Sequence, residues 1–192
     1  MPAAMLHLLT ARYFLPEGDG RFLLGCIAPD ARHSRPEKDA LHFRDCPDRP
    51  AALRVLAAEL PKDDSFSLGW LLHLYTDLCW DDTAIAAFRR DYQGEEDWFP
   101  AYRRESHKAS FGLYHGESWS GEAFSTLCAA DEEPGSPLLP VEGEALAAYR
   151  EQVYRKHRES DPASRSDCFP PERLHAFARE TAEGFRLWLQ SL

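Results

Sequence analysis

The chain is poor in positive charge and in long hydrophobic runs. Its 192 residues carry 22 Lys and Arg against 32 Asp and Glu, for a formal net charge of −10. A broad nucleic-acid interface needs clustered positive charge, so we expect no nucleic-acid partner. No apolar stretch approaches the roughly 18 residues that cross a bilayer, and the first residues lack the basic segment of a signal peptide. We therefore expect no membrane span and a cytoplasmic location.

The chain also lacks paired cysteines. No C-x-x-C pair occurs, which makes a zinc-finger-like structural site unlikely. An odd number of scattered cysteines predicts reduced, buried thiols of a cytosolic protein. These are Cys26, Cys46, Cys79, Cys128 and Cys168.

No segment shows the alternation of a β-strand, and there is no internal repeat. A hydrophobic content of 44% with 12% aromatics is typical of a globular protein. We predict an all-α fold: one helical domain over residues 1–192, a bundle of roughly seven to nine helices with a metal site in a central cleft. Polar residues 31–48, with two prolines, predict a loop. The expected helices cover residues 3–15, 22–28, 50–59, 65–80, 98–113, 142–158 and 171 onward.

The most informative stretch runs from Gly69 to Asp82, where His73 and Asp77 stand four residues apart in an apolar run. On a helix, positions four apart lie on the same face. A buried carboxylate is costly unless a cation or hydrogen-bond donors meet it. A cation or hydrogen-bond donors must therefore contact the Asp77 carboxylate.

Three upstream residues are available to join this pair: His7, Asp30 and His42. Imidazole and carboxylate ligands suit Zn²⁺, Mn²⁺ or Fe, and a carboxylate can bridge two metals. For His73 and Asp77 alone, a hydrogen-bonded pair in the core is an equal alternative. The full ordered set favours a metal site.

Three segments together resemble the zinc-dependent phospholipase C family, which is related in fold to the S1/P1 nucleases. They are Leu24–Asp30, the pair His42-Phe43, and Gly69–Asp77. The resemblance is closest to the short bacterial members without a secretion signal. It covers a family-like core of residues 1–85, whereas residues 86–192 are more divergent.

The resemblance implies a helical fold that holds up to three zinc ions at the bottom of a cleft. By position, it implies that Asp30, His42, His73 and Asp77 form the core metal site, that Asp77 is the bridging carboxylate, and that His7 serves a neighbouring metal. It also implies that Asp30 acts on the attacking water.

Some ligands of the secreted family members are missing from this chain. Met1-Pro2 replaces their N-terminal tryptophan, residues 78–90 contain no histidine, and no later His-x-x-x-Glu follows. The resemblance therefore implies one or two ions here, zinc or else manganese or iron.

Further aromatic and histidine residues are weaker candidates. Four residues form a tentative substrate-binding set: His107, His115, Trp70 and Trp80. Tryptophans in such positions are more often core residues than substrate contacts, although one residue can be both. Solvated surface positions are expected for His33, His157 and His175.

The sequence thus predicts a metal-dependent hydrolase of a small phosphorylated substrate, a phosphodiester or phosphomonoester, acting through a metal-activated water. Asp30 would orient or deprotonate that water. Basic residues would neutralise phosphate charge: Arg32, Arg35 or Arg44. The alternative is a non-catalytic, metal-stabilised helical protein with a binding or structural role, because several family ligands are absent.

Overall fold

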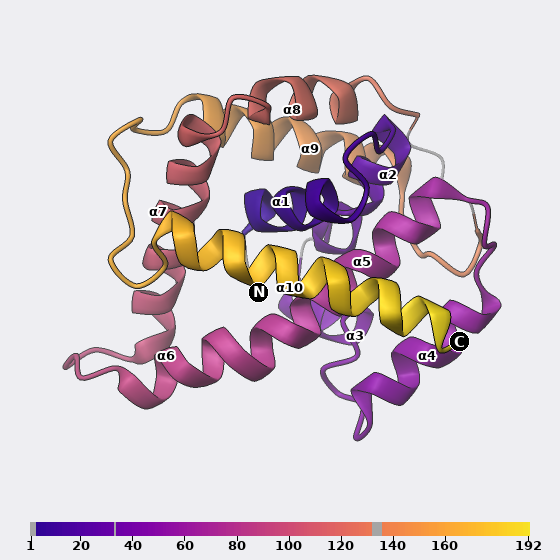
Figure 1. Cartoon of the computed structure of the whole chain (residues 1–192), viewed down its shortest axis with the longest axis horizontal. Coiled ribbons are helices and arrows are strands. Elements are labelled where there is room, and N and C mark those ends of the chain that lie inside the picture. Colours follow the sequence, from indigo (N-terminus) through magenta and orange to yellow (C-terminus); the bar gives the residue numbers. More distant parts are fainter. Residues whose placement is uncertain (1–2, 33, 132–135) are drawn as a thin grey trace.

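The computed structural model describes residues 3–32, 34–131 and 136–192, and no strand occurs among them. This confirms the predicted all-α fold, which is shown in Figure 1. His33 lies outside the described residues, as does part of residues 131–137, whose composition predicts a loop. The α-helices are α1 (Ala4–Phe14), α2 (Gly20–Gly25), α3 (Arg35–Leu41), α4 (Arg49–Glu59), α5 (Ser65–Trp80), α6 (Ala86–Asp91), α7 (Trp98–Gly116), α8 (Ser120–Cys128), α9 (Gly143–Arg158) and α10 (Pro171–Gln190).

Two shorter helical segments complete the chain. A 3₁₀ turn, Ala28–Asp30, follows α2, and a π-helical segment, Asp81–Ile85, joins α5 to α6. The predicted helix over residues 22–28 therefore ends early, at Gly25, and Pro29 lies inside the 3₁₀ turn. Residues 83–92, which the sequence allows either to continue the preceding helix or to start another, continue α5 through the π-helical segment into α6.

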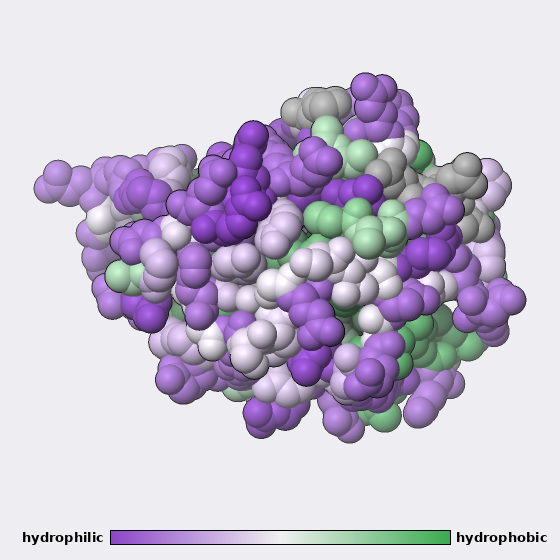
Figure 2. Space-filling view, turned by 90° about the horizontal axis from the view of Figure 1, so that it is seen from above, coloured by the Kyte–Doolittle hydropathy of each residue, from purple (hydrophilic) through white to green (hydrophobic). Residues whose placement is uncertain are grey.

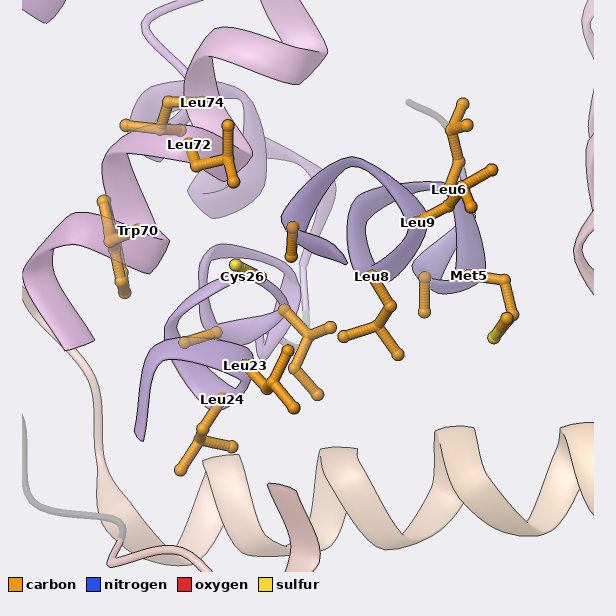
Figure 3. Packing of buried hydrophobic residues seen from close by; sticks show 14 of the residues in the cluster. Met5, Leu6, Leu8, Leu9, Leu23, Leu24, Cys26, Trp70, Leu72 and Leu74 are labelled. Carbon is orange, nitrogen blue, oxygen red and sulfur yellow. The ribbon is translucent and has the colours of Figure 1, made fainter. Parts of the chain in front are cut away.

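Helix α5 lies in the core because its residues are apolar on nearly every side. It packs against α1, α2, α4 and α10. Figure 3 shows Cys26, which directly follows α2, between α5, the helix of Leu72 and Leu74, and the leucines of α1. In Figure 1, α10 crosses the front of the molecule and α1 runs beside it. The core thus surrounds the helix that carries His73 and Asp77.

Helices α2 and α5 touch through their backbones at two glycines. A Cβ atom at Gly69 would overlap the carbonyl oxygen of Phe22, and one at Gly25 would overlap the carbonyl oxygen of Phe66. Only glycine permits so close an approach. The contact lies one turn before His73, so it fixes the distance between α2 and the site.

The predicted loop over residues 31–48 is wrong in its first half, because α3 forms there. Ser34 and Glu37 make a capping box, in which each side chain bonds to the backbone N–H of the other. Pro36 stands in the first turn, where its fixed φ suits a helix. These local signals outweigh the polar composition of the segment.

The surface shown in Figure 2 is largely hydrophilic, with small hydrophobic groups between the polar ones. None of the helices, in the part of the chain that the structure describes, is long and apolar enough to cross a membrane. All five cysteines are free, and Cys26 is buried as expected. Cys46 is exposed, so the expectation of buried thiols is wrong at that position. Cys79, Cys128 and Cys168 are only partly buried.

The close contact between the backbones of α2 and α5 predicts that one added methyl group at Gly69 destabilises the protein. Gly69→Ala should lower the free energy of unfolding by about 1–3 kcal/mol, because the backbone of α2 must move away. The matched control is Gly121→Ala, whose added Cβ meets nothing within 4 Å and should be neutral or stabilising by up to about 1 kcal/mol. Urea unfolding of both variants measures the difference. Equal midpoints would contradict the proposed contact.

Candidate metal centre

Five side chains from four different elements meet in the core. His7 comes from α1, Asp30 from the 3₁₀ turn, His42 from the residue that caps α3, and His73 and Asp77 from α5. Each is between 0% and 6% exposed. The structure therefore brings together all five residues that the sequence predicts as metal ligands.

Two of the histidines have their outer ring nitrogens fixed by backbone carbonyl groups. Nδ1 of His73 lies 2.8 Å from the carbonyl oxygen of Cys26, and Nδ1 of His42 lies 2.6 Å from that of Lys38. A carbonyl oxygen only accepts, so each Nδ1 must carry the proton. In the neutral rings, both Nε2 atoms then present a lone pair.

These two lone pairs face one another. Nε2 of His42 lies 2.9 Å from Nε2 of His73 and 3.1 Å from Oδ2 of Asp77. The distance from His73 Nε2 to Asp77 Oδ2 is 4.0 Å. Ligands bonded to one ion at about 2 Å lie no more than about 4 Å apart. The three atoms thus have the spacing of ligands to a single cation.

A second group of atoms adjoins the first. The ring of His7 stacks on that of His73 at 3.8 Å, and its Nε2 lies 3.5 Å from Oδ1 of Asp77. Oδ1 of Asp30 lies 3.8 Å from Nε2 of His42. Both ring nitrogens of His7, Oδ1 of Asp30 and Oδ1 of Asp77 are buried without a hydrogen-bond partner among the described residues. Buried polar atoms are rarely left unpaired, so the donor set fits a cation.

The geometry allows one ion or two. His73 offers a single nitrogen, because its Nδ1 is used by Cys26, so only one ion can take it. Asp77 points Oδ2 toward His42 and His73 and Oδ1 toward His7. The two oxygens of Asp77 could therefore serve two ions, with His7 beside the second oxygen. Asp30 lies near His7 and His73, in a second group of atoms that could hold an ion.

The segment after α3 is held by a strained residue and a charged network. Phe43 has a φ of 54°, a conformation that is uncommon for a bulky residue and is often found at functional sites. On either side of it, His42 points into the cluster and Arg44 reaches Asp77 at 3.3 Å and Asp81 at 2.9 Å. Arg49 bonds to Asp81 and to the carbonyl oxygen of His42. These contacts fix the orientation of His42 and Asp77 within the cluster.

Burial and charge shift the pKa values of the cluster in opposite directions. Burial lowers the pKa of His7 and of His73 to about 3. Burial also acts to lower the pKa of His42, but the hydrogen bond and charge of Asp77 outweigh it and raise that pKa. Burial acts to raise the pKa of Asp77, but His42 and the other imidazoles hold it well below its usual range. The cluster favours an ionised carboxylate beside neutral His7 and His73.

The tentative substrate residues have other neighbours. Trp70 is buried with its ring 6.2 Å from that of Phe66, and the indole N–H of Trp80 donates to the hydroxyl of Tyr102. On α7, His107 is exposed, and Nε2 of His115 lies 3.0 Å from Oγ of Ser160. The contacts of the two tryptophans are core contacts.

The expectation that His157 and His175 are surface residues is wrong for the first and partly wrong for the second. His157 is buried, with Nε2 bonded to the hydroxyl of Ser110 and Nδ1 to the carbonyl of Val153. His175 is partly buried between Tyr13 and Glu117. Both histidines have many charged neighbours in the sequence, and for this reason the sequence does not show that each lies on the inward-facing side of its helix.

Two residues next to Asp30 have no signal in the sequence. Nζ of Lys38 lies 3.8 Å from Oδ1 of Asp30, and the side chain of Tyr149 on α9 interacts with the Asp30 carboxylate. Lys38 belongs to α3, which the polar composition of residues 31–48 did not predict. Tyr149 is more than a hundred residues away from Asp30 along the chain. Only the tertiary fold brings them to the site.

Comparison with known proteins adds no relative. No protein-family model, curated protein or solved structure matches the chain. The function of the protein is therefore inferred from the geometry of the site and from the sequence resemblance.

The lowered pKa values predict acid sensitivity of the metal-free protein. The pKa of His7 and of His73 is about 3 in the fold and about 6.5 in an unfolded chain. The unfolded chain therefore takes up protons first, and stability falls as the pH drops below about 6.5. The raised pKa of His42 opposes this only in part. Urea midpoints in chelator at several pH values between 7.5 and 5.5 measure the slope.

Burial also lowers the pKa of His157, to about 4, so three buried histidines contribute to the slope. His7→Gln should flatten that slope in part, because it removes one of the three. The control is His115→Gln, which should keep the wild-type slope even if it lowers stability. A wild-type midpoint that does not change between pH 7.5 and 5.5 would contradict the neutral state of the buried imidazoles.

Proposed function

We propose that the protein is a metal-dependent hydrolase of phosphoric esters. The observation that carries the proposal is the pair of Nε2 lone pairs of His42 and His73, which converge beside Asp77 while carbonyl groups hold both Nδ1 atoms. Histidine ligands of metals typically donate their other N–H in this way. The nitrogen and oxygen donors suit Zn²⁺, with Mn²⁺ or Fe as alternatives.

The sequence resemblance gives the reaction class. The segments that carry Asp30, His42, His73 and Asp77 are those that resemble the zinc-dependent phospholipase C family, whose chemistry is phosphoester hydrolysis. When bound, a divalent ion lowers the pKa of a water molecule and offsets negative charge on the phosphoryl group.

Asp30 is the residue best placed to take a proton from the attacking water. Its Oδ1 has no hydrogen-bond partner among the described residues, and it lies 3.8 Å from Nε2 of His42. Asp77 is less suited to this role because Arg44 and His42 already engage its Oδ2. Asp30 is also the most exposed of the five ligands, at 6%.

A closed site of this kind favours a small substrate. Four of the five ligands are no more than 1% exposed, so a substrate must approach on the side of Asp30. The proposal therefore names a small phosphorylated molecule, not a nucleic acid or a lipid within a bilayer. We propose a cytoplasmic location because the scattered cysteines show no pairing pattern.

The same burial supports a second candidate function. A structural metal site is closed by protein ligands, whereas a catalytic site keeps a coordination position for water or substrate. If His7, His42, His73 and Asp77 all bind one ion, the protein is a non-catalytic, metal-stabilised helical protein with a binding or structural role. Counting the water ligands of the bound ion distinguishes the two functions.

Metal should stabilise the fold through Asp77. A ligand that binds only the native state at 100 times its Kd adds about 2.7 kcal/mol. Wild-type protein should therefore melt at a higher temperature with Zn²⁺ than with chelator, and Asp77→Ala should lose most of that difference. A wild-type melting temperature that is the same in Zn²⁺ and in chelator would remove the basis of the metal site.

Activity should depend on Asp30 and on metal together. We expect hydrolysis of 4-nitrophenyl phosphate or bis(4-nitrophenyl) phosphate that stops in chelator and returns with Zn²⁺ or Mn²⁺. Asp30→Asn should reduce kcat by about 10²-fold or more, the typical contribution of a general base, while metal analysis shows at least one ion still bound.

The control is Asp63→Asn, which changes an exposed carboxylate in the loop before α5. It should keep wild-type activity and metal content. Full occupancy by an ion without a water ligand, with no turnover of either ester, would support the non-catalytic function instead.

A further inference from the structure

Lys38 and Tyr149 flank the one ligand that approaches the surface. The ammonium nitrogen of Lys38 lies 3.8 Å from Oδ1 of Asp30, and the same nitrogen lies 5.7 Å from the ring centre of Tyr149. The side chain of Tyr149 on α9 also interacts with the Asp30 carboxylate. A cation, a hydroxyl donor and a carboxylate thus meet at one edge of the metal centre.

Two other basic groups near the cluster, Arg44 and Arg49, are engaged by carboxylates. Arg44 pairs with three of them, Asp39, Asp77 and Asp81. Arg49 pairs with Asp81 and holds the carbonyl oxygen of His42. These two arginines hold the ligands in place.

Lys38 differs from these arginines. Its Nζ makes no hydrogen bond to the described residues, and its side chain is 24% exposed. Its only carboxylate contact there is the long one to Asp30. The ammonium group therefore keeps its donors for a ligand that approaches from solvent.

We propose that Lys38 and Tyr149 form the recognition pair for a dianionic phosphate group, so that the substrates are phosphomonoesters. This inference rests on the proposed function. It assigns the charge recognition to Lys38, in place of Arg32, Arg35 or Arg44, which the sequence suggested.

The chemistry of the pair favours a monoester over a diester. A monoester carries nearly two negative charges and three terminal oxygens, which Lys38, Tyr149 and the metal centre can share. A diester carries one charge and a second substituent on phosphorus, for which a cluster exposed by no more than 6% leaves little room.

The test measures binding of inorganic phosphate to the zinc-loaded protein by calorimetry. Lys38→Met should weaken binding by about tenfold or more, since hydrogen bonds to charged groups are the stronger ones. Tyr149→Phe should weaken it by about fivefold. Lys38→Met keeps the backbone carbonyl that holds His42, so zinc content should not change. Lys38→Arg should restore part of the affinity.

Two variants of α9 serve as matched controls. Lys156→Met removes an exposed lysine charge and Tyr154→Phe a phenolic hydroxyl away from Asp30, and both should bind phosphate as wild type does. Methyl phosphate should compete with inorganic phosphate at least about tenfold better than dimethyl phosphate.

The outcomes separate the two proposals. Unchanged phosphate affinity in Lys38→Met and Tyr149→Phe, or equal competition by both esters, overturns the recognition pair while metal-dependent turnover still supports the hydrolase. Failure of the wild type to take up zinc overturns the hydrolase itself. Loss of zinc in Lys38→Met, with Lys156→Met unaffected, would assign Lys38 to metal retention and also overturn the pair.

Discussion

The hydrogen bond from Nδ1 of His73 to the carbonyl oxygen of Cys26 is the contact on which the site depends. It joins α2 to α5, and it forms only because Gly25 and Gly69 let the two backbones touch. It also fixes the proton on Nδ1, so the lone pair of Nε2 points at His42 and Asp77. The packing of two helices thereby determines the chemistry of one ring nitrogen.

The cluster opposes folding unless something neutralises it. A buried carboxylate and buried polar nitrogens without partners each cost free energy, and Asp77, His7 and His73 are all nearly inaccessible to solvent. Arg44 offsets part of the charge of Asp77. A bound cation would satisfy the remaining lone pairs at once, which is why geometry and energetics point to the same ligand.

The sequence predicted the members of the buried His and Asp cluster better than their surroundings. His73 and Asp77 follow from helical periodicity, and Asp30 and His42 from the order of motifs around them. The helix that positions His42 was missed because its capping box lies in a polar segment. Lys38 and Tyr149 were missed because their proximity is tertiary, and the inward side of His157 was hidden by the charge of its helix. Local sequence patterns indicate where a helix forms and which of its faces is apolar. Which residues of different helices lie close together is seen only in the folded structure.

The most direct test of the central claim is a ¹⁵N NMR measurement of the histidine rings with and without Zn²⁺. The account predicts that His42 and His73 keep the proton on Nδ1 in both states, and that their Nε2 resonances shift when one equivalent of zinc is added. Rings that do not respond to zinc, or a His42 that keeps protons on both nitrogens in its presence, would show that a shared proton and not a metal joins the two imidazoles.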